Sequence, residues 1–115
     1  MKNRDLRDYL SDLIEACQDI LSFTKGMSYD NFIQDKKTIN AVVRSLEVIG
    51  EASKNMPIHF RENYPNIPWK QMAGMRDKLI HEYFGIDKEM VWQVIGRHIP
   101  HILPLLKKIS LDNKK

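Results

Sequence analysis

The sequence has 115 residues, of which 43% are hydrophobic, and its 18 basic and 15 acidic side chains give a formal net charge of +3. These values predict one globular domain, residues 1–115, with enough apolar side chains to form a core. No stretch is apolar for long enough to cross a membrane, the first residues lack the pattern of a signal peptide, and a single cysteine, Cys17, excludes an internal disulfide. We therefore expect a cytoplasmic protein with no membrane partner.

Positive and negative side chains are interspersed along the chain, apart from the lysine pairs at 107–108 and 114–115. Proteins that bind a long nucleic-acid backbone usually carry a clustered basic stripe. The charge pattern therefore does not favour nucleic-acid binding. We expect no DNA partner, and only a small RNA site is compatible with this pattern.

Apolar residues recur at the helical period in three long segments, residues 4–24, 36–55 and 88–109. Ser28 is expected to cap a short connecting helix, and Asp35 is a suitable N-cap for the second long helix. A fourth helix, residues 68–84, is predicted from a row of side chains at helical spacing: Met72, Met75, Leu79 and Tyr83. No strand pattern is present, so the predicted fold is all-α, an antiparallel bundle of four to five helices.

The last helix contains two prolines, Pro100 and Pro104, each of which removes a backbone donor and crowds the carbonyl four residues before it. For Pro100 that earlier residue is Gly96, which adds no side chain to the crowding. We expect this C-terminal helix to be kinked between Gly96 and Pro104 without breaking.

The helix at 36–55 contains a row of small side chains, Gly50, Ala52 and Ser53. Because a helical glycine costs about 1 kcal/mol relative to alanine, this row indicates either a close helix crossing or a ligand that approaches the backbone. Glu47 and Glu51 share one helix face. They form either a solvated edge or a site where one carboxylate pairs with a nearby arginine, Arg76 or Arg44.

The fourth predicted helix carries an unusual set of polar groups, Arg76-Asp77-x-x-x-His81-x-Tyr83. On an ideal helix Arg76 and Tyr83 lie within about 20° of each other, whereas His81 lies about 140° from Arg76. The arginine and the histidine can therefore meet only if the helix loosens near its end or if two copies of the helix come together. The ordinary alternative is a solvated arginine and a histidine near a helix C-terminus.

Other site chemistry has little support in the sequence. A di-metal site in a helical bundle needs Glu-x-x-His pairs, and no glutamate here has a histidine three residues later. His98 and His101 could share a helix face, but no further ligand accompanies them. There is also no glycine-rich phosphate loop. We expect neither a metal nor another cofactor.

The polar set resembles the R-x4-H-x-Y signature of the HepT-like toxins, small helical ribonucleases of the HEPN superfamily. Further segments match the same family: Ile67-Pro68-Trp69, Phe84-Gly85-Ile86-Asp87, Ile49-Gly50-Glu51-Ala52 and Leu103-Pro104-x-Leu106. The resemblance spans about residues 6–109, and the signature is complete.

The resemblance implies a homodimer that cleaves RNA, a tRNA among the candidates, without a metal ion, at a cleft between the two copies. Arg76 and His81 would be catalytic, with the arginine on the phosphate and the histidine as acid or base, and Asp77 would support one of them. In the resembling toxins the tyrosine at the position of Tyr83 is adenylylated by a minimal nucleotidyltransferase antitoxin. Two other interpretations remain: a non-catalytic module that binds nucleotide or docks a nucleotidyltransferase, and a purely structural bundle.

Overall fold

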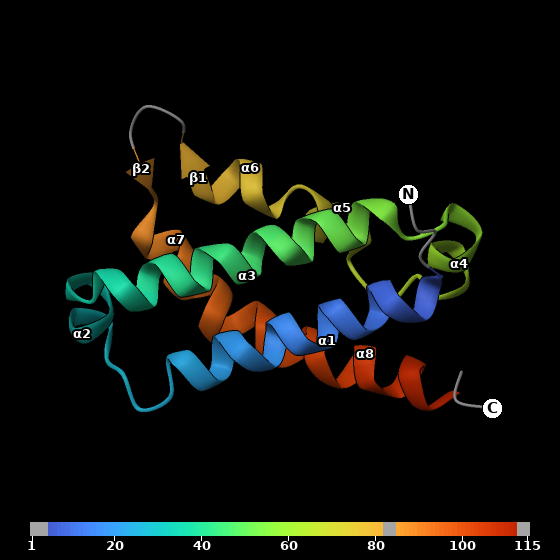
Figure 1. The fold of residues 1–115 in the computed structure, drawn as a ribbon, viewed down its shortest axis with the longest axis horizontal. Coiled ribbons are helices and arrows are strands. Elements are labelled where there is room, and N and C mark those ends of the chain that lie inside the picture. The colour runs from blue at the N-terminus through green and yellow to red at the C-terminus, as the bar shows by residue number, and fades with distance from the viewer. Residues whose placement is uncertain (1–4, 82–84, 113–115) are drawn as a thin grey trace.

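The computed structural model describes residues 5–81 and 85–112, with the backbone but not the side chains of Arg76, Ile80 and His81. Helices make up most of this part of the chain, so the all-α prediction is confirmed (Figure 1). The longest are α1 (Leu6–Phe23), α3 (Lys36–Asn55) and α8 (Ile99–Asp112).

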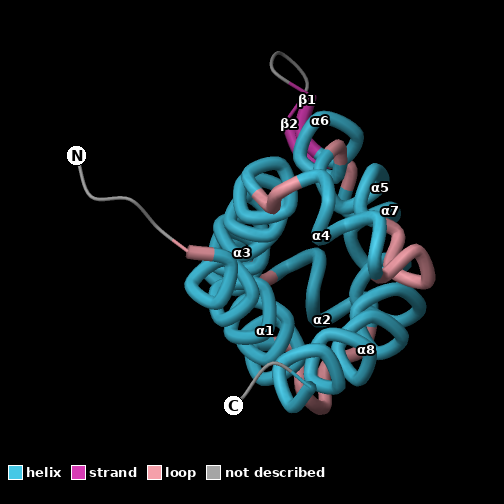
Figure 2. Tube along the Cα trace, turned by 90° about the vertical axis from the view of Figure 1, so that its right-hand side faces the viewer, coloured by secondary structure: helices cyan, strands magenta, loops and turns pink. Residues whose placement is uncertain are grey.

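The core lies between these long helices and the short ones that cover them. Helix α1 packs against both α3 and α8, and α3 also packs against α5 (Trp69–Ala73) and α6 (Met75–Leu79). Figure 2 shows α3 and α8 on opposite sides of the molecule, with α1 between them along one edge. Each long helix contributes a stripe of fully buried side chains, among them Leu13, Ile20, Leu46, Ile49 and Leu106.

Polar caps fix where the first helices begin. Asp5 accepts hydrogen bonds from the backbone of Arg7 and Asp8 at the start of α1. Ser28 forms a capping box at the start of α2 (Tyr29–Gln34), and the Asp35 carboxylate accepts from Thr38 N at 3.0 Å at the start of α3. Each bond satisfies a helix N–H group that has no partner within the helix, so the predicted caps at Ser28 and Asp35 are confirmed.

The C-terminal helix continues through both prolines, as predicted. It consists of α7 (Lys88–Gln93), a π-helical turn (Val94–His98) and α8, and Figure 1 shows that α7 and α8 differ in direction. The N–H of Ile99 donates to Val94 O, five residues back, as a π-helix requires. Because the next residue, Pro100, has no N–H, an ordinary ladder of hydrogen bonds could not have continued there.

Aromatic contacts join two segments that are far apart in the sequence. Trp92 of α7 packs on Phe32 and Tyr29 of α2, with ring centroids 5.1 and 6.1 Å apart. Helix α4 (Ile58–Asn63) forms a turn between α3 and α5, and Phe60 within it is buried.

None of the helices in the described part of the chain is long and apolar enough to span a membrane.

The fourth predicted helix, residues 68–84, is wrong as a continuous helix. Helix α5 ends at Ala73, the backbone of Gly74 departs from the helical conformation, and α6 ends at Leu79. The next residues form a strand, β1 (Ile80–His81), which pairs antiparallel with β2 (Gly85–Ile86). This two-stranded pair also corrects the expectation that the chain has no strand.

Candidate functional site

The motif segment, residues 69–86, is fixed at its beginning by Trp69. The indole is 6% exposed, and its Nε1–H donates to the backbone oxygen of Tyr64 at 3.0 Å. Phe60 packs near the rings of Tyr64 and Trp69, at centroid distances of 5.0 Å and 6.5 Å respectively. A buried aromatic ring with a satisfied polar group makes a rigid anchor. Helix α5 therefore begins from a fixed point in the core.

Helix α6 carries the first residues of the motif and is held by its apolar side. Met72, Met75 and Leu79 are all buried, so this part of the predicted apolar row is confirmed. Gly74 interrupts the segment with φ −91° and ψ 2°, and its N–H donates to Lys70 O at 3.1 Å. The chain thus changes backbone conformation once just before Arg76.

A second change of conformation separates Arg76 from His81. Ile80 pairs with Ile86 and His81 pairs with Gly85 across the two strands, while Asp87 N donates to Leu79 O at 3.0 Å. Gly85 has a φ of +81°, a conformation that a residue with a side chain adopts only at a cost. The helix therefore ends at Leu79 because the following backbone groups bond across the strand pair instead of along a helix.

This arrangement bears on the two ways in which the arginine and the histidine could meet. The angle of about 140° assumed a straight helix, and His81 is not on that helix. Arg76 lies on α6 and His81 lies on β1, so the end of the helix is interposed between them. Asp77 is exposed on α6. Tyr83 lies outside the described residues.

Sequence reasoning missed the strand pair although a signal was present. Two β-branched residues, Ile80 and Ile86, flank a short segment that ends in Gly85. Asp87 also caps α7, with its carboxylate accepting from Met90 N at 3.1 Å. A helix that must begin at residue 88 leaves little room for the previous one to continue to residue 84. The repeat of apolar residues at helical spacing concealed this limit.

The row of small residues in α3 lies in the interior. Gly50, Ala52 and Ser53 are buried on a helix that packs against α1, α5 and α6. Burial of such short side chains between helices agrees with the close helix crossing that was one of the two interpretations. The Ser53 hydroxyl has no hydrogen-bond partner among the described residues.

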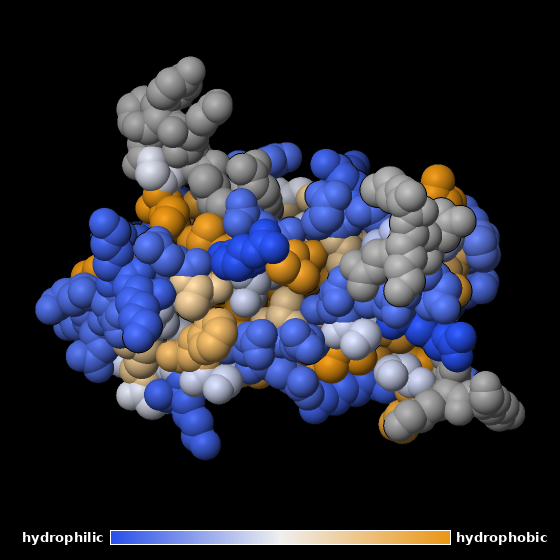
Figure 3. Space-filling model, in the orientation of Figure 1, coloured by the Kyte–Doolittle hydropathy of each residue, from blue (hydrophilic) through white to orange (hydrophobic). Residues whose placement is uncertain are grey.

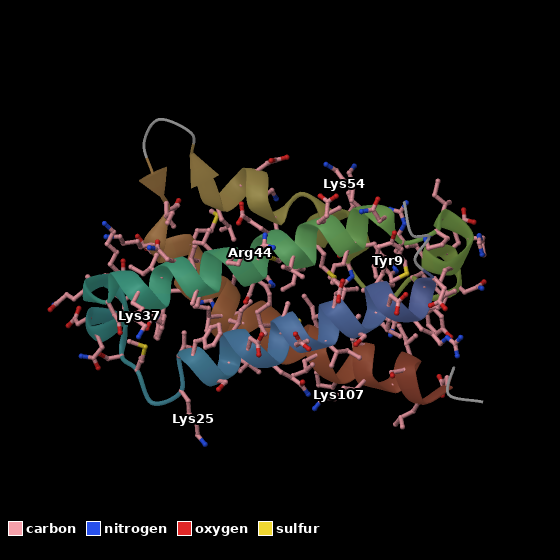
Figure 4. All side chains as sticks on the ribbon, viewed as in Figure 1. Tyr9, Lys25, Lys37, Arg44, Lys54 and Lys107 are labelled. Atoms are coloured by element: carbon pink, nitrogen blue, oxygen red, sulfur yellow. The ribbon has the colours of Figure 1, made fainter. Side chains whose placement is uncertain are left out.

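One of the two glutamates of α3 does pair with an arginine. Glu47 lies 4.0 Å from Arg44 across one turn of the helix, in a partly exposed position. Glu51 accepts a hydrogen bond from the Asn55 side chain at 3.2 Å. Arg44 thus pairs with this edge of α3, and Figure 4 shows it in the middle of the helix. The other expected partner, Arg76, lies outside the described side chains.

A groove of about 390 Å³ runs between α5 and α6 on one side and α7, the π-helical turn and α8 on the other. Its floor is apolar, with Met72, Met75 and Leu79 among the buried side chains. Exposed polar side chains form its rim: Gln71, Lys78, Gln93 and His98. The wall formed by α6 belongs to the same helix as Arg76.

Two histidines and the cysteine are further candidates for reactive groups. His98 and His101 are both exposed, and in the part of the chain that the structure describes they do not form a metal-binding group with a third ligand. Cys17 is fully buried in α1, and burial raises the pKa of its thiol to about 12. A thiol in this state is a poor nucleophile, so Cys17 acts as a core side chain.

The sequence also matches a known protein family over most of its length. A family model described as "Ribonuclease HepT-like" matches residues 13–109. This range includes the small residues of α3, the whole motif segment and most of α8.

Several relatives match along almost their whole length. "Putative RNase MJ0127" of Methanocaldococcus jannaschii is 48% identical over 112 residues, which cover 97% of this chain and 93% of the relative. "Putative RNase MJ1216" of the same organism is 51% identical with the same coverage. "Probable ribonuclease HepT" of Thermococcus cleftensis is 47% identical over 92% of this chain and 96% of its own length.

No solved structure gives a significant match. The family match nevertheless covers most of the sequence and agrees with relatives close to half identical. The resemblance drawn from the motif is therefore confirmed: the chain belongs to the ribonuclease HepT-like family.

Proposed function

We propose that this member of a ribonuclease family cleaves RNA without a metal ion, with Arg76 and His81 as its catalytic residues. The observation that carries the proposal is the break in the motif helix. Arg76 lies on α6 and His81 on the strand that follows, with four residues between them in the sequence. A change from helix to strand between them removes the restriction that kept the two residues on different faces.

The chemistry uses the 2′-hydroxyl of the ribose as the nucleophile. One histidine takes the 2′ proton while the O2′–P bond forms, the P–O5′ bond breaks, and a second histidine gives a proton to the leaving O5′. The products are a 2′,3′-cyclic phosphate and a 5′-hydroxyl end. An imidazole suits both steps, since its unperturbed pKa is near 6.5.

Two histidines in one pass imply two copies of the chain. Each copy supplies one His81, so we propose a homodimer in which the two motif segments face a shared cleft. Arg76, planar and permanently charged, would bind the scissile phosphate and stabilise the charge that develops on it. Asp77, exposed on the same helix, would orient one of these groups.

The family match also supports a place for this enzyme in a toxin–antitoxin pair. We propose that a minimal nucleotidyltransferase neutralises the ribonuclease by adenylylating Tyr83, two residues after His81 in the sequence. The added phosphate would be negatively charged and would compete with RNA for Arg76. Transfer of this group forms a phosphodiester bond to the tyrosine oxygen and releases pyrophosphate from ATP.

The test is cleavage of a panel of tRNAs and single-stranded RNAs in EDTA by the wild type, His81→Ala and Arg76→Ala. The protein comes from cells without a nucleotidyltransferase, and its mass is checked for a modified Tyr83. His59→Ala is the matched control, because His59 is exposed on α4, outside the motif segment.

We expect cleavage by the wild type and the control, and loss of cleavage in both motif variants with dimerisation retained. Unchanged cleavage in His81→Ala would overturn the catalytic assignment. Absence of cleavage by unmodified wild type, with tight binding to a nucleotidyltransferase, would instead identify a docking module. Weaker dimerisation in both motif variants would indicate a structural pair.

A further inference from the structure

One region of the chain carries charge of a single sign. From Met90 to Leu111 the sequence contains no aspartate or glutamate, but it contains five basic or titratable nitrogen side chains. All five are exposed on the π-helical turn and α8: Arg97, His98, His101, Lys107 and Lys108. We call this surface the basic face. In the sequence only the lysine pair at 107–108 stands out, because the charges of the whole chain are otherwise interspersed.

The helix arranges three of these side chains in a line, with His98 and Lys107 to either side of it. Arg97, His101 and Lys108 follow one another after four and seven residues, close to one and two helical turns, so they lie along the same side. At 1.5 Å per residue the line is about 16 Å long. Pro100 and Pro104, both exposed, lie between these side chains and add no negative charge.

Acidic side chains do not neutralise the basic face in the described part of the molecule. Across residues 5–81 and 85–112, none of the five side chains forms an ion pair. Three of the four acidic side chains of α1 are gathered elsewhere: Asp12, Glu15 and Asp19 line a groove that α1 forms with α3, together with one cation, Arg44. Figure 2 shows α3 across the molecule from α8. The chain thus separates a negative groove from a positive face.

The basic face borders the groove beside the motif helix. His98 and Ile102 form one wall of that groove, and Gln71 and Lys78 belong to the other. The second wall is built by α5 and α6, and α6 carries Arg76. An RNA chain bound along α8 could therefore cross the groove to the motif segment without leaving the surface of the protein.

We propose that the basic face binds the sugar–phosphate backbone of single-stranded RNA and that the adjoining groove receives one of its bases. A line that begins and ends with a permanent cation, Arg97 and Lys108, matches a polyanion, and binding would release counterions from it. A groove with an apolar floor and amide groups at its rim suits an unstacked base, which offers two flat faces and a polar edge. This proposal rests on the ribonuclease function and deepens it, because the RNA that is bound here is the RNA that is cleaved.

The test compares two double variants that remove the same charge. Arg97→Gln with Lys108→Gln alters the basic face, and Lys37→Gln with Lys54→Gln alters α3. Lys37 and Lys54 are exposed and lie toward opposite ends of α3 (Figure 4). The probe is a fluorescent single-stranded RNA with 2′-O-methyl groups, which leave no 2′-hydroxyl to attack. Binding is measured by anisotropy across a titration of salt.

Loss of two phosphate contacts on a single strand should reduce the slope of log affinity against log salt by about 1.4, because each contact contributes about 0.7. At about 0.1 M salt the same loss corresponds to about 25-fold weaker binding. We expect both effects in Arg97→Gln/Lys108→Gln. The α3 control should retain the wild-type slope, because a change in net charge alone removes no phosphate contact.

The outcome separates this surface from the catalytic proposal. Wild-type slope and affinity in Arg97→Gln/Lys108→Gln would overturn the basic face as an RNA site, even if the wild type cleaves RNA. The same result with weakened dimerisation would assign the face to contacts between copies. A reduced slope in a protein that does not cleave would retain the binding surface and refute only the catalysis. An equal loss in both double variants would also overturn the proposal, because binding would then depend on net charge alone.

Discussion

Helix α3 and the motif segment lie side by side in the molecule, yet their backbones differ in kind. Helix α3 runs for 20 residues without interruption. The motif segment divides a similar length into two five-residue helices and a pair of two-residue strands. Both bury apolar side chains in the same core. The difference is that the motif segment changes conformation at Gly74 and again after Leu79.

This comparison suggests a division of roles. A long helix with a cap and an apolar stripe obtains its stability from packing along its length. The motif segment has shorter elements, each held at a few points, such as Trp69 and the bond from Asp87 to Leu79. Its second change of conformation falls between the two proposed catalytic residues. If the division is correct, damage to α3 should lower mainly stability, whereas damage to the motif segment should lower mainly function.

The largest effect on stability should come from the core side of α3. Leu46 is fully buried, so Leu46→Ala should lower the free energy of unfolding by about 2–5 kcal/mol through lost burial and a cavity. Ile58→Ala is the control, since Ile58 is 66% exposed and its loss should change stability by less than about 0.5 kcal/mol. Urea unfolding followed by circular dichroism measures both. Equal losses in the two variants would contradict the assigned core.

A smaller effect should separate stability from function. Gly85 and Gly26 have φ values of +81° and +77°, and a Cβ at either position would meet no atom within 4 Å. Alanine at either site should therefore cost a similar amount, about 1–2 kcal/mol, through backbone strain alone. Only Gly85 lies in the strand pair with His81.

We therefore expect Gly85→Ala to lower RNA cleavage beyond its effect on folding, and Gly26→Ala to leave cleavage per folded molecule unchanged. The measurement is the initial rate of cleavage at a temperature where both variants are fully folded. If Gly85→Ala and Gly26→Ala both cleaved RNA as fast as the wild type, the turn conformation at residue 85 would not matter to the site. A loss in both would mean that the comparison between the two regions is wrong.

The smallest effect concerns the cap of α3 and appears only in acid. The hydrogen bond from the Thr38 backbone holds the pKa of the Asp35 carboxyl below its ordinary value. A pKa lowered by folding stabilises the protein above the unfolded pKa of about 3.9, and this stabilisation is lost as pH falls through the folded pKa.

The side-chain amide introduced by Asp35→Asn would still offer a cap oxygen but would not titrate. This variant should therefore lose less stability than the wild type below about pH 4. Urea unfolding of both proteins at neutral pH and at a pH of about 3 gives the comparison. Parallel loss of stability in the two proteins would show that the cap charge has no part in it.

The sequence predicted the parts of the fold that obey one local rule over many residues. The apolar stripes of α1 and α3, and the caps at Ser28 and Asp35, follow from spacing and hydrogen-bond chemistry alone. The motif residues also stand out in the sequence, because polar groups at fixed spacing are visible without a structure, and their roles stay a prediction. What the sequence did not predict was the backbone conformation around them. Met75 and Leu79 fit a helix, and nothing local to them shows that the chain must turn back to reach Asp87.

The basic face was not predicted from the sequence, for a different reason. Its five residues are spread over twelve positions and are separated by apolar and proline residues, so no long run of charge appears in the sequence. Only the helix aligns three of them, Arg97, His101 and Lys108, along one side. Figure 3 shows another side of the molecule, where hydrophilic side chains surround patches of hydrophobic ones.

The π-helical turn before Pro100 has a consequence for the evolution of chain length. A turn of this kind holds one residue more than an α-helical turn, so deletion of one residue from Val94–His98 would convert the turn into ordinary α-helix with little change in the direction of the side chains that follow. Deletion of one residue from the first turn of α8 would instead rotate the following side chains by about 100° and take Leu106 out of the core. The π-helical turn is therefore the place where this helix can lose one residue with the least effect on the core.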